Sequence, residues 1–429
     1  MWSDTVGIQE GIQNVKIKGI FFLLISGLLA ALILVYLTFQ SGNGNRYERT
    51  ENSTSVIRIL ASYEMKSEQE LLNSIAEQYE RQCDGVDVQF QWIDRENLKK
   101  EVCLSVDAGK QLDLVICSNR EVTGLMDMEV LQEVPEALAD QEFRETLLYP
   151  ELWKEFSDEG KYYGIPFTLD PYVLFCNTVY FERKQSAYPQ TWEELLDICE
   201  KTGETGISGL GFGVKRTGDA ADLFDAILYT FDGNYYALDS EGGKNTLELL
   251  DILKKRGCIN KNVVNCTPTD AAYEFAERKM LMLLAPLSIR GCLETKMEST
   301  EFRIYPIPEG VKTGHAVTGN AIGILKTAGT QASDFLQFLF EENNRREIIE
   351  KTGTLPLYLS EAEISLSDDV QILDDIFREK GSVPGSNSNW FEVSSILAAY
   401  QYNILVKRNV NADSLLSGLQ DDVRVAIMR

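Results

Sequence analysis

An uncharged apolar run from Gly19 to Phe39 (GIFFLLISGLLAALILVYLTF) stands near the start of an otherwise polar, acidic sequence. As a helix it would be about 30 Å long, which matches the hydrocarbon core of a bilayer. No polar face interrupts the run, so a helix in the core of a globular domain is a poor interpretation. The run therefore predicts a single transmembrane helix.

The flanks of this run distinguish an uncleaved anchor from a signal that is removed. A signal-peptide core usually has about 7–15 apolar residues and a small-x-small cleavage site, whereas this longer run ends in bulky residues. A lipoprotein signal needs a cysteine just after the run, and the first cysteine is Cys83. We therefore expect an uncleaved anchor at residues 19–39 and a cytoplasmic tail at 1–18. Basic residues on the two sides nearly balance, so they do not fix the orientation.

The composition after the run predicts a stalk and a large soluble part. Residues 40–54 (QSGNGNRYERTENST) lack large aliphatic side chains, which predicts a flexible stalk. The remainder, residues 55–429, exceeds a typical single domain and predicts two lobes. Sixty-six acidic residues against 41 basic ones give a formal net charge of −25. Such a field repels nucleic acid, so we expect no nucleic-acid partner.

Short apolar strands alternate with amphipathic helices through the soluble part. The first predicted strands are Val56–Ala61, Val86–Ile93 and Asp113–Cys117, separated by helices over Ser67–Gln82 and Arg95–Ala108. Ser67 and Glu70 fit a capping box at the start of the first of these helices. Repeated β-α-β units with buried strands predict a parallel sheet that is covered by helices on both faces.

The same alternation returns in the second half of the sequence. Strands are predicted at 210–214, 280–285 and 304–308, and helices at 191–202, 219–230, 243–256, 331–350, 368–380, 390–406 and 412–425. The fold class is therefore α/β with two lobes. In open α/β sheets ligands bind beyond the carboxyl ends of the strands, so the candidate site lies in the loops that follow them.

Motifs for catalysis, cofactors and metals are absent from the sequence. There is no GxSxG elbow, HExxH helix, P-loop or dinucleotide fingerprint, and the glycine string Gly209–Gly213 predicts only a tight turn beside a strand. The single histidine, His315, and eight cysteines without CxxC spacing argue against a zinc site. We therefore expect no enzymatic activity, no cofactor and no bound metal.

Aromatic side chains point to a binding function instead. They make up 10% of the chain, and several stand beside polar residues, among them Tyr172, Trp390 and the pairs Tyr162-Tyr163 and Tyr235-Tyr236. Aromatic faces stack on sugar rings, while Asp, Asn and Arg side chains bind the hydroxyl groups. Packing in a hydrophobic core is the alternative for each aromatic residue taken alone.

Several segments, in this order, resemble the family 1 extracellular solute-binding proteins, the carbohydrate-type receptors of ABC importers. The resemblance extends from about Val56 to the C-terminus. Pro and Gly in these segments mark points where the chain leaves one lobe for the other. The segments are KYYGIPF at 161–167 with VLFCN at 173–177, PQTWEEL at 189–195, FAERKMLM at 275–282, FLQFL at 335–339 and TGTLP at 352–356.

The resemblance implies two hinged lobes that close on a solute, a periplasmic-binding-protein-like (type II) fold. The first lobe would contain residues 55–167 with about 315–352, and the second residues 168–314 with about 353–429. The implied role is a monomeric receptor at the cell membrane, with its soluble domain outside. It would capture a small molecule, a sugar, and pass it unaltered to the permease of an ABC importer.

By position, the family's ligand loops fall at strand ends and lobe crossings of this sequence. We expect Tyr172 and Trp390 to supply stacking surfaces, and Glu64, Asn119, Arg120 and Asp170 to supply hydrogen bonds. The full set of expected ligand-binding residues is Tyr63, Glu64, Ser118, Asn119, Arg120, Thr168, Asp170, Tyr172, Lys215, Arg216, Asn320 and Trp390.

The sequence departs from the family pattern where aromatic side chains are frequent. Leu287-Ser288 and Gly314-His315 stand at two positions that often carry tryptophan. Their loss weakens the case for a long oligosaccharide and leaves room for a smaller or more polar ligand. Two other roles stay open from the residues: a ligand-sensing ectodomain that partners a sensor kinase, and a membrane-anchored polysaccharide hydrolase.

Overall fold

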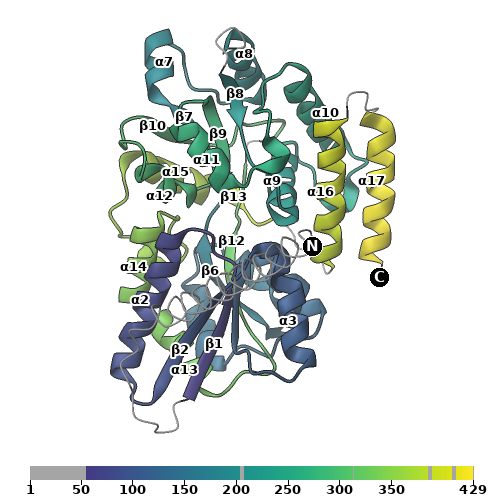
Figure 1. Cartoon of the computed structure of the whole chain (residues 1–429). Helices are drawn as coiled ribbons and strands as arrows, with labels where there is room; N and C mark the ends of the chain where they lie inside the picture. The colour runs from purple at the N-terminus through teal and green to yellow at the C-terminus, as the bar shows by residue number, and fades with distance from the viewer. Residues whose placement is uncertain (1–54, 203–206, 313, 385–388, 408–411, 429) are drawn as a thin grey trace, which may run out of the picture. The chain divides into compact units, whose positions relative to one another are not determined.

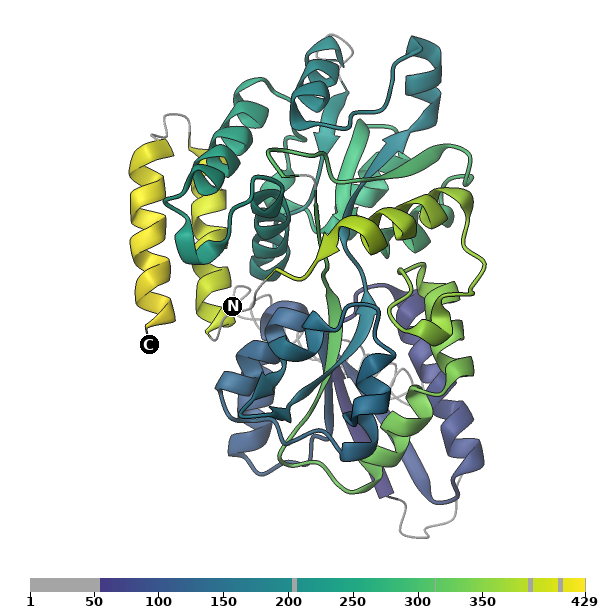
Figure 2. The ribbon, with the colours of Figure 1, turned by 180° about the vertical axis from the view of Figure 1, so that it is seen from behind.

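The computed structural model describes residues 55–202, 207–312, 314–384, 389–407 and 412–428. Two β-sheets, each covered by helices, divide these residues into a first lobe and a second lobe (Figure 1). The first lobe is the lower half of Figure 1, and Figure 2 shows both lobes from behind. The tail, anchor and stalk predicted for residues 1–54 lie outside the described residues.

The first lobe is built on a five-stranded sheet. In spatial order its strands are β2 (Val86–Trp92), β1 (Ser55–Ala61), β3 (Leu114–Ser118), β12 (Gly319–Ile324) and β6 (Gly164–Leu169). Its longer helices are α2 (Lys66–Gln82), α3 (Leu98–Asp107), α4 (Asn119–Asp127), α13 (Gln331–Leu339) and α14 (Glu342–Thr352). Shorter elements are η1 (Arg95–Asn97), η2 (Glu136–Leu138), α5 (Gln141–Glu145), α6 (Glu151–Glu155), η5 (Leu359–Glu361) and the hairpin β4–β5 (Ser157–Asp158, Lys161–Tyr162).

The second lobe is built on a four-stranded sheet. Its strands are β10 (Phe302–Pro306), β7 (Tyr172–Asn177), β9 (Met280–Pro286) and β8 (Ser208–Gly211). Its helices are α7 (Thr178–Lys184), α8 (Trp192–Thr202), α9 (Thr217–Thr230), α10 (Glu241–Lys255), α11 (Pro268–Ala276), α12 (Ile289–Glu294), α15 (Asp368–Lys380), α16 (Trp390–Val406) and α17 (Ala412–Ile427), with short turns η3 (Tyr235–Ala237) and η4 (Val263–Asn265). In Figure 1 α16 and α17 stand beside α9 and α10, and α16 contacts α9.

The expectation of parallel sheets is only partly correct. β1 pairs in parallel with β2 and β3, and β8 pairs in parallel with β9. β12 is antiparallel to both of its neighbours, and so is β7. The reason is that β7 and β12 enter their sheets directly from the other lobe. A parallel neighbour would require a crossover helix on the same sheet.

Two connections between the lobes run side by side. The turn from β6 to β7 contains Asp170, whose backbone N–H donates to the carbonyl of Thr318 at 2.9 Å. Thr318 leads into β12, where a Cβ atom on Gly319 would lie 1.8 Å from the carbonyl oxygen of Thr168. Only glycine permits so close an approach. The short strands β11 (His315–Ala316) and β13 (Gly381–Ser382) pair nearby. The lobe boundaries predicted at residues 167/168 and 352/353 stay predictions.

The start of α2 differs from the expected capping box. The helix begins at Lys66, after Met65, and no side chain caps it. Instead the Gln69 amide donates to the carbonyl of Tyr63 at 2.8 Å. This start places Glu68 on the buried stripe of α2, in line with Leu72 and Ile75. A carboxylate thus stands where an apolar side chain is usual.

Candidate ligand-binding cleft

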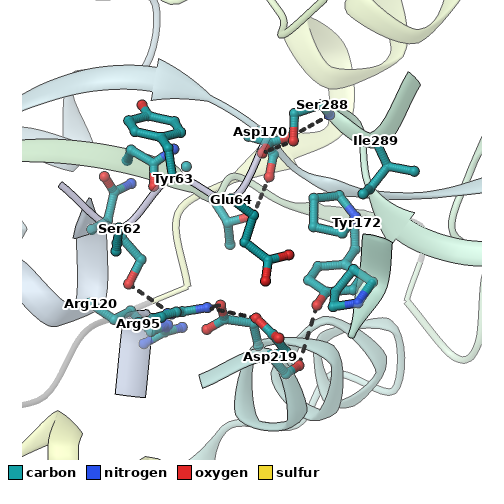
Figure 3. Close-up of a pocket in the computed structure, with 18 of the residues that line it drawn as sticks. Ser62, Tyr63, Glu64, Arg95, Arg120, Asp170, Tyr172, Asp219, Ser288 and Ile289 are labelled. Carbon is teal, nitrogen blue, oxygen red and sulfur yellow. Dashed lines mark hydrogen bonds and ion pairs between the residues drawn. The ribbon is translucent and has the colours of Figure 1, made fainter. Parts of the chain in front are cut away.

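A cleft of about 150 Å³ lies between the two lobes, lined by loops that follow strands of both sheets (Figure 3). The ends of β1 and β3 and the start of β12 contribute from the first lobe. The second lobe contributes the beginnings of β7, α9 and α11 and the end of β9. This position agrees with the rule that α/β proteins bind ligands beyond the strand ends.

Most of the predicted ligand residues come together in this cleft. Those that line it are Tyr63, Glu64, Ser118, Asn119, Arg120, Asp170, Tyr172, Arg216 and Asn320. Lys215 lines an adjoining hollow together with Arg216. Thr168 lies beneath the lining, where its Oγ1 accepts a hydrogen bond from Asn320 Nδ2 at 3.1 Å. Trp390 is outside the lining and is buried.

Arg95 joins three carboxylates from both lobes. Its Nε lies 2.8 Å from Glu121 Oε1 in the first lobe, and its Nη1 lies 2.6 Å from Asp222 Oδ2 and 3.5 Å from Asp219 Oδ1 on α9. Its Nη2 donates to Ser118 Oγ at 3.0 Å. The side chain is 12% exposed. Figure 3 shows Arg95 reaching across the cleft to Asp219.

Arg120 forms a second link between α4 and α9. Its Nη2 lies 2.5 Å from Asp225 Oδ2, and its Nη1 donates to the Tyr235 hydroxyl at 3.0 Å. The guanidinium carbon lies 4.9 Å from the centre of a Trp390 ring. The stacking surface expected from Trp390 is therefore used on Arg120, because α16 packs against α9 and buries the indole behind the arginine.

Arg216 forms a third link, from the second lobe to the first. It pairs with Glu64 and lies 3.7 Å from Asp94 Oδ1. Glu64 also accepts a hydrogen bond from Thr269 at 2.9 Å. The glycine string accounts for this placement, since a Cβ atom on Gly213 would lie 2.2 Å from the backbone of Thr267. Backbone contact at that point directs the following residues into the cleft.

Together, these three links join the two lobes across the cleft, so the cleft is closed. Each arginine pairs with a carboxylate on the opposite lobe, and α9 presents three of the partners at intervals of three residues, Asp219, Asp222 and Asp225. Side chains spaced in this way lie along one face of a helix. Two of the three links, those of Arg95 and Arg120, are therefore ion pairs along a single helix face.

Asp170 and Glu68 form an acidic region at the other side of the cleft. Asp170 accepts hydrogen bonds from Ser288 N at 2.8 Å and Ser288 Oγ at 2.7 Å (Figure 3). Burial raises the pKa of Asp170 to about 6. Burial, together with the nearby charge of Asp170, also raises the pKa of Glu68 above its usual range. Both carboxyl groups thus favour the protonated form more than free side chains do.

The family model of bacterial extracellular solute-binding proteins matches residues 74–375. The chain belongs to this family. The resemblance drawn from the sequence is thereby confirmed, and family membership places this solute-binding protein among binding proteins rather than enzymes. No curated protein matches the chain.

Solved structures share the two-lobe fold at low sequence identity. Maltose-bound MalE3 of T. maritima is 16% identical with a TM-score of 0.76, covering 86% of this chain and 100% of that one. An ABC transporter solute-binding protein from Thermotoga lettingae TMO, bound with alpha-D-tagatose, is 18% identical with a TM-score of 0.76, covering 88% and 100%. The GacH receptor of Streptomyces glaucescens GLA.O, solved unliganded and with acarbose, is 16% identical with a TM-score of 0.76, covering 88% and 99%. These similarities confirm the predicted two-lobe α/β fold.

The membrane anchor predicted at residues 19–39 is not part of the described structure. Within the described ranges, no helix is both long and apolar enough to cross a bilayer. The same ranges contain no cluster of three or more His, Cys, Asp or Glu side chains that could hold a metal ion.

The sequence interpretation missed several residues of the cleft. Ser288 appeared only as a departure from the family, and the others were not singled out; they are Glu68, Arg95, Glu155, Asp219, Asp222 and Thr269. The sequence did contain patterns that could have indicated two groups of these residues. Arg95 follows β2 just as Tyr63 follows β1, and the aspartates of α9 recur every three residues after β8. Glu68 had no such signal, since it neither directly follows a strand nor belongs to a series of aspartates at regular spacing.

The raised pKa of Asp170 predicts that it stabilises the ligand-free protein more at pH 5 than at pH 7.5. The folded protein binds this proton more tightly than the unfolded chain, so the contribution is present below about pH 4 and lost as the pH rises through about 6. It should fall by about 1–1.5 kcal/mol between pH 5 and pH 7.5. Urea denaturation of the wild type and of Asp170→Asn at both pH values would measure the difference.

Comparison with the variant removes from this result the titrations of groups that do not interact with Asp170. Burial lowers the pKa of His315 to about 4, which acts in the opposite direction, but His315 is unchanged in Asp170→Asn and cancels in the difference. Asp84→Asn, at an exposed position, is the control and should match the wild type. Equal pH dependence in the wild type and Asp170→Asn would contradict the prediction.

Proposed function

We propose that this solute-binding protein captures a small carbohydrate between its lobes and delivers it, unaltered, to an ABC importer. The observation that carries the proposal is the cleft itself, where polar side chains of both lobes and the tyrosines Tyr63 and Tyr172 surround one cavity. Hydroxyl-rich solutes need many hydrogen-bonding groups around an apolar face, and this lining offers both. Three solved structures with the same fold hold maltose, tagatose and acarbose as ligands.

The proposal includes a tether. Residues 19–39 would anchor the chain as a single-pass helix, and the polar stalk at 40–54 would leave the two-lobe domain free to reach the permease on the outer face. We propose that the domain acts as a monomer, since one cleft formed by two lobes suffices to enclose a solute. Lobe closure would commit the solute to transport, as hinged binding proteins do.

A thermal-shift screen of the full chain against mono- and disaccharides, amino acids, polyamines and phosphates tests this function. A ligand at a hundred times its dissociation constant should add about 2.7 kcal/mol to the free energy of unfolding. Stabilisation by saccharides is the expected result. Stabilisation by amino acids or phosphates, with no response to any saccharide, would overturn the carbohydrate assignment.

Tyr172→Ala should weaken saccharide binding by about 1–3 kcal/mol, because the ring supplies apolar contact area in the cleft. Its hydroxyl donates to the carbonyl of Asp219 at 3.3 Å, a long hydrogen bond within the second lobe. Tyr172→Phe should therefore bind nearly as well as the wild type. Titration calorimetry measures both, with Tyr402→Ala on the exposed face of α16 as the control. Unchanged affinity in Tyr172→Ala would show that the ring does not contact the ligand.

A further inference from the structure

Carboxylates outnumber arginines in the lining of the cleft. The arginines are Arg95, Arg120 and Arg216, and the carboxylates are Glu64, Glu68, Glu155, Asp170, Asp219 and Asp222. An enclosed site of low dielectric strengthens the field of such an imbalance. The lining therefore favours a ligand that brings positive charge.

The three arginines are engaged by carboxylates other than Glu68 and Asp170. Arg95 pairs with Glu121, Asp219 and Asp222. Arg120 pairs with Asp225, which lies behind the lining, and Arg216 pairs with Glu64. The arginines thus neutralise one side of the cleft and leave the acidic region at Asp170 uncompensated.

Glu68 is a buried carboxylate in this acidic region. It is 7% exposed, it lines the cavity, and no described residue donates a hydrogen bond or forms an ion pair with it. A buried carboxylate without such a partner is costly. Asp170 receives hydrogen bonds from Ser288 but is likewise in no ion pair with a described residue. Two acids without a cation therefore face the same space.

A further acceptor lines the same cavity. The side-chain oxygen Oδ1 of Asn119 is buried and has no hydrogen-bond partner among the described residues, and Asn119 is 5% exposed. Buried acceptors of this kind are normally satisfied. Asn119 thus adds a neutral acceptor to the cavity that the carboxyl groups of Glu68 and Asp170 line.

We propose that the captured solute carries a positively charged amine that binds between Glu68 and Asp170. An ammonium group donates three hydrogen bonds and neutralises the acidic region, whereas a sugar hydroxyl donates one and brings no charge. Combined with the proposed function, on which this step rests, the ligand is a small amino sugar whose amine is not acylated.

The charged surroundings of these two acids also predict how binding depends on pH. Glu68 faces Asp170 and the Tyr63 hydroxyl, and Asp170 faces Ser288, Glu68 and Asp222 of α9. Because burial raises the pKa of both acids, protons leave the site when the amine binds. Affinity for an amine should therefore weaken as the pH falls below about 6, where Asp170 holds a proton, and net proton release on binding should accompany this weakening.

Disaccharides that differ only at carbon 2 test the inference. Cellobiose has a hydroxyl there, N,N′-diacetylchitobiose has an acetamide, and the fully deacetylated form has an amine. Titration calorimetry of the full chain at pH 7.5 and pH 5, in buffers of different ionisation enthalpy, measures affinity and proton release. We expect the amine form to bind at least tenfold more tightly than either neutral disaccharide at pH 7.5, and to lose that advantage at pH 5.

Charge-removing variants localise the effect. Glu68→Gln and Asp170→Asn keep the shape of the side chains and should each reduce the preference for the amine at least tenfold. Glu77→Gln, on the exposed face of α2, is the matched control and should keep it. Melting temperatures verify that each variant is folded.

The outcomes separate this inference from the proposed function. Neutral disaccharides that bind as tightly as the amine form would overturn the amine inference and leave carbohydrate capture standing. Binding of spermidine without binding of any disaccharide would keep the amine site and overturn carbohydrate capture. Retention of the amine preference in both variants would show that Glu68 and Asp170 do not form the site.

Discussion

Arg95→Gln should open the cleft. The substitution leaves Glu121, Asp219 and Asp222 without the guanidinium that now joins them. Removing one partner from a buried ion pair costs about 3–5 kcal/mol. Separation of the lobes would return water to Asp219 and Asp222, so the cost should appear as a population shift rather than as unfolding. At about 1.4 kcal/mol for each factor of ten, the ratio of closed to open molecules should fall at least a hundredfold.

Small-angle X-ray scattering of the ligand-free protein measures this shift. We expect a larger radius of gyration in Arg95→Gln, while the free energy of unfolding in urea changes by less than about 1 kcal/mol. Arg81→Gln, at an exposed ion pair with Glu77, should leave both quantities unchanged. A large loss of unfolding free energy with unchanged scattering would show that Arg95 stabilises the fold and not the closed state.

Arg345→Met should destabilise the folded first lobe by about 3–5 kcal/mol. Glu361 is 0% exposed, and its Oε1 lies 2.7 Å from Arg345 Nε. Its other oxygen accepts the backbone N–H of Leu357 at 2.7 Å and that of Tyr358 at 3.1 Å. The arginine lies 5.0–5.3 Å from three aromatic ring centres, those of Tyr358, Phe167 and Phe340. Without the arginine, a buried charge remains among aromatic rings.

Urea denaturation measures this loss, and a neighbouring residue supplies the control. Arg346 forms an exposed pair with Glu342 one residue along the same helix, so Arg346→Met should cost less than about 1 kcal/mol. The double variant Arg345→Met, Glu361→Gln should recover most of the loss, because no charge is then left unpaired. A double variant as unstable as Arg345→Met would attribute the loss to packing instead.

Much of the secondary structure could be predicted from the sequence. The helices predicted at residues 368–380 and 390–406 coincide with α15 and α16, because periodic apolar positions report burial directly. The direction of each strand within its sheet could not be predicted from the sequence in this way. Periodicity does not indicate which strands are neighbours, and nothing in the residues of β12 shows that it is inserted between β3 and β6 from the opposite direction.

Residues of the candidate site that directly follow a strand could be predicted from the sequence. Residues that reach or leave the cleft through the packing of one helix on another could not. The loops after β1 and β3 supplied Tyr63 and Ser118 by position. Trp390 was misplaced because its burial depends on how α16 lies on α9, which no local pattern reveals. Glu68 was missed for a similar reason, since only the angle of α2 brings that position into the cleft.

The place of β12 in its sheet has a consequence for synthesis. β3 and β6 flank a gap that stays empty until residues 319–324 of the 429-residue chain have been made. A nascent first lobe therefore presents two bare strand edges while most of the polypeptide leaves the ribosome, which exposes it to aggregation. The sheet of the first lobe therefore cannot be completed before β12 has been synthesised, so the folding of this lobe ends late in synthesis.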